Sequence, residues 1–137
     1  MDCIFCKILK KEIPSTVILD NKNVFAFLDI RPVNLGHILI IPKKHYRNIY
    51  DIPEDQFCLL AKFVKKISIA LKKALHADGI NLGMNNDEAA GQIVEHAHIH
   101  IIPRFKNDGL KHWPQKNYKN SEGEQIAKKI RKNLDNF

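Results

Sequence analysis

The chain has 137 residues, a formal net charge of +7 and a hydrophobic fraction of 45%. This length suits one domain with its own core and is too short for two ordinary domains. The longest aliphatic run is only residues 38–41, whereas a membrane span needs roughly 20 apolar residues, so we expect a cytoplasmic protein with no membrane span and no signal peptide.

The positive charge is spread along the chain in lysine pairs and forms no single basic block. Such a distribution suits anionic partners in general, but it favours solvated helix faces over a dedicated nucleic-acid surface. Aromatic residues, which stack on bases in single-strand-binding proteins, are not interleaved with the basic ones. We therefore do not expect a nucleic acid as the partner.

The first half of the chain predicts three strands. Residues 16–20 and 24–29 are rich in β-forming residues, and the turn-forming residues between them predict a hairpin. The β-branched run of residues 37–41 predicts a largely buried strand that Pro42 ends.

One long helix follows these strands. Apolar residues recur at helical spacing from Phe57 to Leu75, with lysines on the other faces. Pro53 fits the first turn of this helix and Asp78-Gly79 fits its end. Cys58 lies within the apolar pattern, so we expect it to be a buried, inert thiol.

The second half predicts further strands and a last helix. Residues 80–85 predict a strand, residues 86–91 a polar loop, and residues 92–102 a long alternating strand stopped by Pro103. Residues 123–134 predict a terminal amphipathic helix. Together these elements predict an α+β fold with a mostly antiparallel sheet, one long helix and a C-terminal helix.

The most informative residues form a row of alternating histidines. On a strand, His96, His98 and His100 share one face and span about 13 to 14 Å. The residues between them point to the opposite face, toward a core: Ala97, Ile99 and Ile101. Three imidazoles in strict alternation are hard to explain by packing, since each buried ring needs hydrogen-bond partners. A metal site or nucleophilic and acid-base chemistry would each suit such a row.

The stretch His-Ala-His-Ile-His-Ile-Ile of residues 96–102 resembles the signature of the histidine triad superfamily, in which histidines alternate with apolar residues. Other stretches are similar to landmarks of the same family: residues 3–8, 27–32, 36–45 and 91–92. The resemblance covers roughly residues 2 to 114, and residues 112–114 resemble more loosely the tail of the nucleotide-binding, phosphoramidase-like branch.

This resemblance implies a HIT-like fold for a histidine triad domain of residues 1–114, followed by a C-terminal extension of residues 115–137 that carries a helix. It also implies that the partner is a purine nucleotide or a nucleotide conjugate. The expected activity is hydrolysis or transfer at the α-phosphate of a purine nucleoside phosphoramidate or a dinucleoside polyphosphate. The reaction would pass through a nucleotidyl-histidine intermediate. The family usually forms a homodimer, with the long helix and a strand edge at the interface, and we expect one here.

The family's catalytic roles fall on three histidines of this sequence. His98 matches the nucleophile, His100 a catalytic and phosphate-binding histidine, and His37 a supporting histidine. Asn85 and Gln92 match further phosphate contacts, which would supply donors to the charge that develops in the transition state.

The nucleoside would lie against a carboxylate and an apolar slot. Asp29 matches the carboxylate that accepts the ribose hydroxyls. The slot for the base matches five residues: Ile4, Phe5, Ile8, Phe27 and Ile30. By composition alone each of these five is more often a core residue, and only the resemblance favours ligand contact.

The pair Cys3-x-x-Cys6 has the spacing of a zinc site or a redox dithiol. The redox interpretation expects a preceding strand that residues 1 and 2 cannot supply, which favours zinc. The resemblance implies that His45 and His96 complete a structural Cys₂His₂ site. In the alternative, the cysteines are free and His96 is only hydrogen-bonded. A closed four-ligand site leaves no open position for substrate, so zinc would not take part in catalysis.

One departure from the family pattern lies beside the triad. The nucleotide-binding branch usually carries a phosphate-contacting serine where this chain has Ile93, which puts the leaving-group specificity in doubt. Two other functions remain open at this point: a nucleotide-binding sensory module with little turnover, and a zinc-dependent nucleic-acid-binding module.

Overall fold

The computed structural model describes residues 2–134. In chain order its elements are α1 (Ile4–Leu9), β1 (Val17–Asp20), β2 (Val24–Leu28), β3 (Ile38–Pro42), α2 (Glu54–Leu75), β4 (Gly79–Gly83), a 3₁₀ turn η1 (Glu88–Ala90), β5 (Ile99–Arg104) and α3 (Glu122–Leu134). The strands form one sheet in the order β1-β2-β3-β5-β4, and every neighbouring pair is antiparallel. The predicted α+β class is confirmed.

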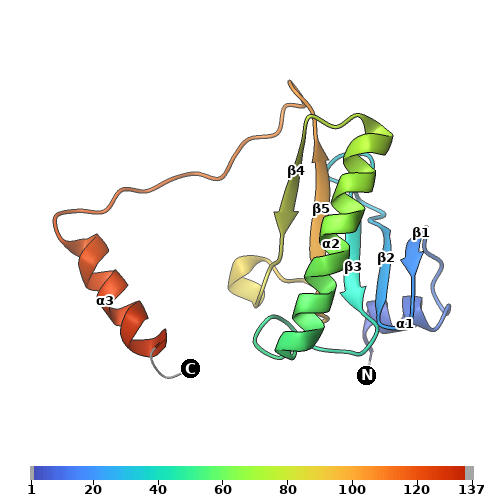
Figure 1. Ribbon diagram of the computed structural model, residues 1–137, viewed down its shortest axis with the longest axis horizontal. Coiled ribbons are helices and arrows are strands. Elements are labelled where there is room, and N and C mark those ends of the chain that lie inside the picture. The colour runs from blue at the N-terminus through green and yellow to red at the C-terminus, as the bar shows by residue number, and fades with distance from the viewer. Residues whose placement is uncertain (1, 135–137) are drawn as a thin grey trace.

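The two faces of the sheet are covered by different helices (Figure 1). Strand β3 shows why, because its alternating side chains serve two cores. Ile38 and Ile40 pack with α2, whereas Leu39 and Ile41 pack with α1. The second face, between α1 and the sheet, is the one toward which the histidines point.

Helix α2 follows the predicted apolar stripe, with Leu60, Val64, Ile67 and Leu71 buried. Cys58, however, is exposed, so the expectation of a buried thiol was wrong. Cys58 precedes Leu60 by two residues, which is about 200° around a helix, and therefore lies on the opposite side from the buried stripe.

The ends of α2 differ from the prediction by a few residues. Pro53 is the N-cap, and the helix begins at Glu54. The helix ends at Leu75, where His76 caps it in the left-handed conformation with φ of 52°. Gly79 already opens β4 rather than closing the helix.

The predicted strand of residues 92–102 was wrong at both ends, since β5 begins at Ile99 and continues through Pro103 to Arg104. Pro103 is tolerated because β3 begins at Ile38, opposite Ile101, so no β3 residue pairs with Pro103. Its carbonyl instead accepts a hydrogen bond from the Asn34 side chain at 2.9 Å.

A glycine fixes the approach to β3 and thereby the position of His37. Gly36 has φ of +98°, and a Cβ there would lie 2.4 Å from the Leu75 side chain. The φ favours glycine because other residues rarely adopt it, and a Cβ would also require the end of the Leu75 side chain to move.

The C-terminal arm, residues 109–134, leaves the body of the protein beside β4 (Figure 1). It contains only one regular element, α3, which confirms the predicted terminal helix, and α3 has no buried residue. The boundary between a domain and an extension at residue 114 stays a prediction. Within residues 2–134 no helix combines the length and apolarity needed to cross a bilayer.

Candidate active site

The three histidines of the row lie on one face of the sheet. His96 and His98 precede β5 and His100 lies within it, while Ala97, Ile99 and Ile101 are buried in the core under α2. The ring centroids of His98 and His100 are 5.0 Å apart. The Phe5 ring of α1 packs edge-on against both His96 and His98, with centroids 5.9 and 5.2 Å away. The predicted alternation is thus present, although His96 and His98 lie before the hydrogen-bonded part of the strand.

Hydrogen bonding fixes the tautomer of His98. Its Nδ1 lies 2.7 Å from the carbonyl oxygen of His96. Because a carbonyl can only accept, Nδ1 carries the proton and Nε2 keeps its lone pair. Burial lowers the pKa of His98, which also favours the neutral ring. His98 is only 6% exposed as a residue. Its ring presents a nucleophilic nitrogen rather than a donor at Nε2.

A chain of two hydrogen bonds, called the relay below, begins at a backbone N–H and places the proton of His100 on Nε2, opposite to its place in His98. The Val33 N–H donates to Nδ1 of His37 at 3.1 Å, so a neutral His37 carries its proton on Nε2. This Nε2 lies 2.9 Å from Nδ1 of His100, which must accept. The proton of His100 is therefore on Nε2, where the ring can donate to a ligand.

Burial keeps this pair neutral. It lowers the pKa of His100 to about 4, with the neighbouring His98 and His37 acting in the same direction, and it also lowers the pKa of His37. The carboxylate of Asp29 lies 3.8 Å from Nε2 of His37 and opposes these shifts. Its other oxygen accepts the Arg31 N–H at 2.8 Å, so Asp29 stands beside the relay as a half-buried acceptor.

A second cluster lies at the other end of the row. One ligand atom from each of four residues lies within 4.8 Å of the others: Cys3, Cys6, His45 and His96. The Cys6 sulfur is 3.3 Å from Nδ1 of His45 and 3.7 Å from Nδ1 of His96. A tetrahedral zinc with bonds of about 2.0 to 2.3 Å needs neighbouring ligand atoms about 3.5 Å apart, so these spacings fit the ion.

The tautomer of His96 also fits a metal site. Its Nε2 donates to the Pro42 carbonyl at 2.9 Å, which leaves the lone pair of Nδ1 directed at the sulfurs. Burial lowers the pKa of His96 to about 4, whereas burial and the neighbouring Cys3 raise the pKa of the Cys6 thiol. A bound cation would offset the raised pKa of Cys6, because it favours the thiolate.

The predicted phosphate contacts have different surroundings. The Gln92 amide is engaged within the protein, donating to the carbonyls of Arg47 and Val94 and accepting from the Asp87 N–H at 2.8 Å. Gln92 therefore braces the loop before His96. Asn85 makes one long contact of 3.5 Å to the Gly91 carbonyl, which leaves its amide available for other partners.

The predicted base slot is split between core and surface. Phe5, Ile8 and Phe27 are buried in the core on the α1 side of the sheet. Ile30 is 86% exposed and Ile4 is 44% exposed. The first three can offer a ligand only a small surface, and the structure does not bring Ile30 into their cluster.

Sequence reasoning missed the backbone groups that hold these rings, namely the carbonyls of Pro42 and His96 and the N–H of Val33. Arg47 was also missed; its guanidinium lies 3.1 Å from the Glu95 carboxylate and 3.9 Å from that of Asp87. Backbone groups carry no residue-type signal in a sequence, and a lone arginine gives no spacing pattern.

Comparison with known proteins agrees with this geometry. The HIT domain family matches residues 10–107, a span that contains the whole histidine row. The chain belongs to the HIT domain family. The crystal structure of SMU.412c from Streptococcus mutans UA159 has a TM-score of 0.90 and 42% identity, and the alignment covers 97% of this chain and 85% of that one. Because residues 1–108 are less than four fifths of the chain, this likeness includes the C-terminal arm.

Two other HIT proteins bear on ligands. A Zn-bound histidine triad family protein from Mycobacterium smegmatis has a TM-score of 0.78 and 34% identity, over 99% of this chain and 97% of that one. Adenosine 5'-monophosphoramidase hnt1 of Schizosaccharomyces pombe is 36% identical over 96% of this chain and 100% of that protein. Several further relatives are uncharacterized HIT-like proteins.

Two hollows open near the row in this HIT protein. One, of about 470 Å³, adjoins the Cys₂His₂ cluster and is lined by Arg47, Ile93 and Glu95 among others. Another, of about 440 Å³, is lined by Ile102, Arg104 and Trp113 among others. Ile102 and Arg104 alternate with Pro103 along β5 and so share the face of His100. Ligand groups could thus approach the row from either end.

Proposed function

We propose that this HIT protein hydrolyses or transfers at the α-phosphate of purine nucleoside phosphoramidates or dinucleoside polyphosphates, with His98 as the nucleophile. The observation that carries the proposal is the opposite proton placement in adjacent rings. His98 presents a bare Nε2, held by the His96 carbonyl, while His100 presents an Nε2–H, held by the relay from His37. A nucleophile next to a donor for a phosphoryl oxygen is the pair that attack on phosphorus needs.

The reaction is proposed in two displacements. The lone pair of His98 Nε2 forms a bond to the α-phosphorus, and the bond to the leaving amine or phosphate breaks with its electron pair going to that group, which takes up a proton from water. The His98 ring becomes cationic, and the Nδ1–H···O=C bond to His96 stabilises it. Water then attacks phosphorus, the bond to Nε2 breaks, and the ring returns to its neutral form as water's proton is lost to solvent.

Other residues would bind the nucleotide. The proposal assigns Nε2–H of His100 and the free amide of Asn85 to phosphate oxygens, and the Asp29 carboxylate to the ribose hydroxyls. Phe5, Ile8 and Phe27 would form the floor of the base site, with Ile4 and Ile30 at its margin. Gln92 would act through its backbone neighbours, since its own amide is engaged.

The proposal includes a structural zinc held by Cys3, Cys6, His45 and His96, whose spacing and tautomers fit it. When bound, the ion would tie the N-terminal segment to the triad and supply no chemistry to the reaction. His96 would link the two sites, because its ring belongs to the cluster and its carbonyl holds His98. The thiols of this cluster also fit a reducing compartment, for which we propose the cytoplasm.

The test is turnover of a fluorogenic adenosine 5'-phosphoramidate, together with mass spectrometry of the acid-quenched protein. His98→Asn keeps a donor where Nδ1 stands and removes Nε2. We expect it to lower kcat by about 10⁴-fold, and to abolish the nucleotidyl adduct. The matched control is His76→Asn at the exposed end of α2, a position whose left-handed φ suits Asn.

Unchanged turnover in His98→Asn would show that His98 is not the nucleophile. If the wild-type protein binds AMP but forms no adduct and releases no product, the site instead serves a nucleotide sensor. The low exposure of His98, 6% for the whole residue, supports that second function.

A further inference from the structure

Helix α3 carries an apolar stripe that its own chain leaves uncovered. Ile126, Ile130 and Leu134 recur at four-residue steps and are 44%, 55% and 61% exposed. The helix has 13 residues, and none of them is buried. An isolated helix of this length is marginal in water, so α3 needs a surface against which to pack.

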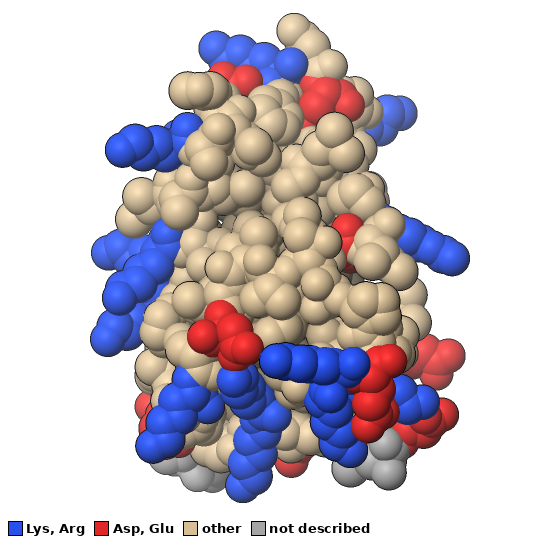
Figure 2. Space-filling view, turned by 90° about the vertical axis from the view of Figure 1, so that its right-hand side faces the viewer, with Lys and Arg blue, Asp and Glu red and all other residues tan. Residues whose placement is uncertain are grey.

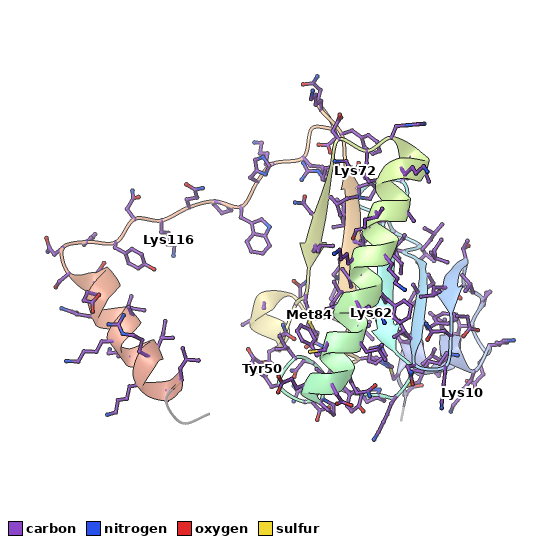
Figure 3. The ribbon with its side chains drawn as sticks, in the orientation of Figure 1. Lys10, Tyr50, Lys62, Lys72, Met84 and Lys116 are labelled. Carbon is purple, nitrogen blue, oxygen red and sulfur yellow. The ribbon has the colours of Figure 1, made fainter. Side chains whose placement is uncertain are left out.

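The arm that carries α3 points away from the chain's own apolar surfaces. Figure 1 shows it leaving the end of β5 and running past β4, with α3 beyond that edge of the sheet. Lys116 lies midway along this extended segment, well clear of the body (Figure 3). The same arm is part of the likeness to the solved S. mutans structure.

An apolar groove lies on the other side of α2, between that helix and the outer strands β1 and β2. Its volume is about 800 Å³, and Lys66 is the one charged residue in its lining. Three of its aliphatic side chains, Ile18, Leu35 and Leu75, are 45%, 83% and 41% exposed. Figure 2, which looks from the β1 side, shows this surface as an uncharged area with lysines and acidic residues around it. Continuous apolar surface of this kind usually marks an interaction site.

We propose that α3 of one copy of this chain docks in the α2–β1 groove of a second copy, and that the second copy returns the same contact. The stripe is aliphatic and the groove is mainly apolar, and an amphipathic helix in an apolar groove is a common recognition mode. A reciprocal exchange closes under two-fold symmetry and leaves neither stripe uncovered. This inference does not depend on the proposed catalytic activity.

The geometry favours a second copy over the chain's own groove. The strand order β1-β2-β3-β5-β4 puts the groove and the arm at opposite edges of one sheet. A second copy beside β4 would extend about 20 to 25 Å, five strands at about 4.8 Å each, before its own β1 is reached. Residues 109–121, when extended, span about 40 Å, so the arm is long enough to cross it.

The first test is hydrogen exchange of the α3 amides in the full chain, with the mass in solution measured alongside. The wild-type protein should be a dimer with α3 exchange slowed at least 10-fold relative to an unprotected helix. Ile130→Lys, on the stripe, should remove this protection, whereas Gln125→Lys, on the polar side of the same helix, should retain it. A monomer, or a wild-type α3 that exchanges freely, overturns the proposal.

The second test mixes two full-length variants. Ala70→Arg places a large charged side chain in the groove from an exposed position of α2, and Ile130→Lys disables the arm. Each variant, measured by itself, should lose the protection of its α3 amides from hydrogen exchange. After subunit exchange, the α3 peptide with the wild-type sequence should regain protection, because its arm now meets an intact groove in the other chain. This rescue also shows that the Ala70→Arg chain is folded.

Two outcomes of the mixing test overturn the proposal. Protection that persists in Ala70→Arg alone means that α3 docks elsewhere. Protection that is lost in Ala70→Arg and does not return on mixing means that α3 binds the groove of its own chain. Leu35→Arg, at a position 83% exposed, repeats the test should Ala70→Arg unfold.

Discussion

His96 and His98 are two residues apart on one extended segment, yet the structure prepares their rings for different tasks. His96 donates from Nε2 to the Pro42 carbonyl and directs Nδ1 at two sulfurs. His98 donates from Nδ1 to the His96 carbonyl and keeps Nε2 free. The difference comes from which ring nitrogen meets a backbone carbonyl, since the residue type and the face of the sheet are the same. One end of the row is therefore suited to a metal and the other to phosphorus chemistry.

The largest expected effect is a loss of stability when the Cys₂His₂ cluster at one end of the row is disrupted. Cys6→Ser should release zinc and lower the free energy of unfolding by several kcal/mol, because metal binding and folding are coupled. Cys58→Ser is the matched control, since that thiol is exposed on α2. Metal content and thermal unfolding, with and without a chelator, measure the effect. Equal stability of both variants would mean that the four-residue cluster holds no structural ion.

The row itself could be predicted from the sequence because alternation with period two needs no tertiary information. The cluster of Cys3 and Cys6 with His45 and His96 followed from the family resemblance, since spacing alone does not connect residues 93 positions apart. The tautomers could not be predicted. They depend on the carbonyl of Pro42, the carbonyl of His96 and the N–H of Val33, and any residue type could supply these groups.

The error in the start of β5 has the same physical origin. Residues 92–98 alternate like a strand, but the Ala97 N–H donates to the Tyr46 carbonyl and the Gln92 N–H to the Asp87 carbonyl, so the segment does not join the ladder before Ile99. Cys58 looked buried because it neighbours apolar residues along the chain. The phase of the predicted stripe already gives the answer, because Cys58 lies about 200° around the helix from Leu60 and therefore on the side away from the sheet.

The relay that sets the proton of His100 provides the next prediction. His37→Gln keeps a polar side chain but cannot hold both the Val33 N–H and Nδ1 of His100 in the same geometry. We expect kcat to fall by about 10- to 100-fold with little change in KM, as when a supporting hydrogen bond to a functional histidine is removed. Steady-state kinetics on the phosphoramidate give both constants. A change confined to KM would place His37 in substrate binding instead.

A smaller effect should appear in the pH dependence of stability. The pKa of His100 is lowered from 6.5 to about 4 by burial, so between these values the unfolded chain binds a proton that the folded chain does not. The free energy of unfolding should therefore be highest above pH 6.5 and fall as the pH drops toward 4. His100→Asn, which keeps an acceptor for His37, should reduce this fall by on the order of 1 kcal/mol. Denaturant unfolding at several pH values measures it, with His76→Asn as the control; parallel curves for wild type and His100→Asn would contradict the assignment.

The smallest expected effect concerns Ile93, where the family's nucleotide-binding branch usually has serine. Ile93 is 92% exposed and lines the hollow beside the Cys₂His₂ cluster together with Arg47. Because so little of it is buried, Ile93→Ser should leave stability unchanged within about 0.5 kcal/mol. A new hydroxyl near the leaving group should raise kcat/KM for phosphate-containing leaving groups by about 2- to 5-fold relative to small amines, the scale of one added neutral hydrogen bond. A panel of AMP conjugates that differ only in the leaving group measures this ratio. An unchanged ratio would mean that the leaving group does not reach the hollow beside the Cys₂His₂ cluster.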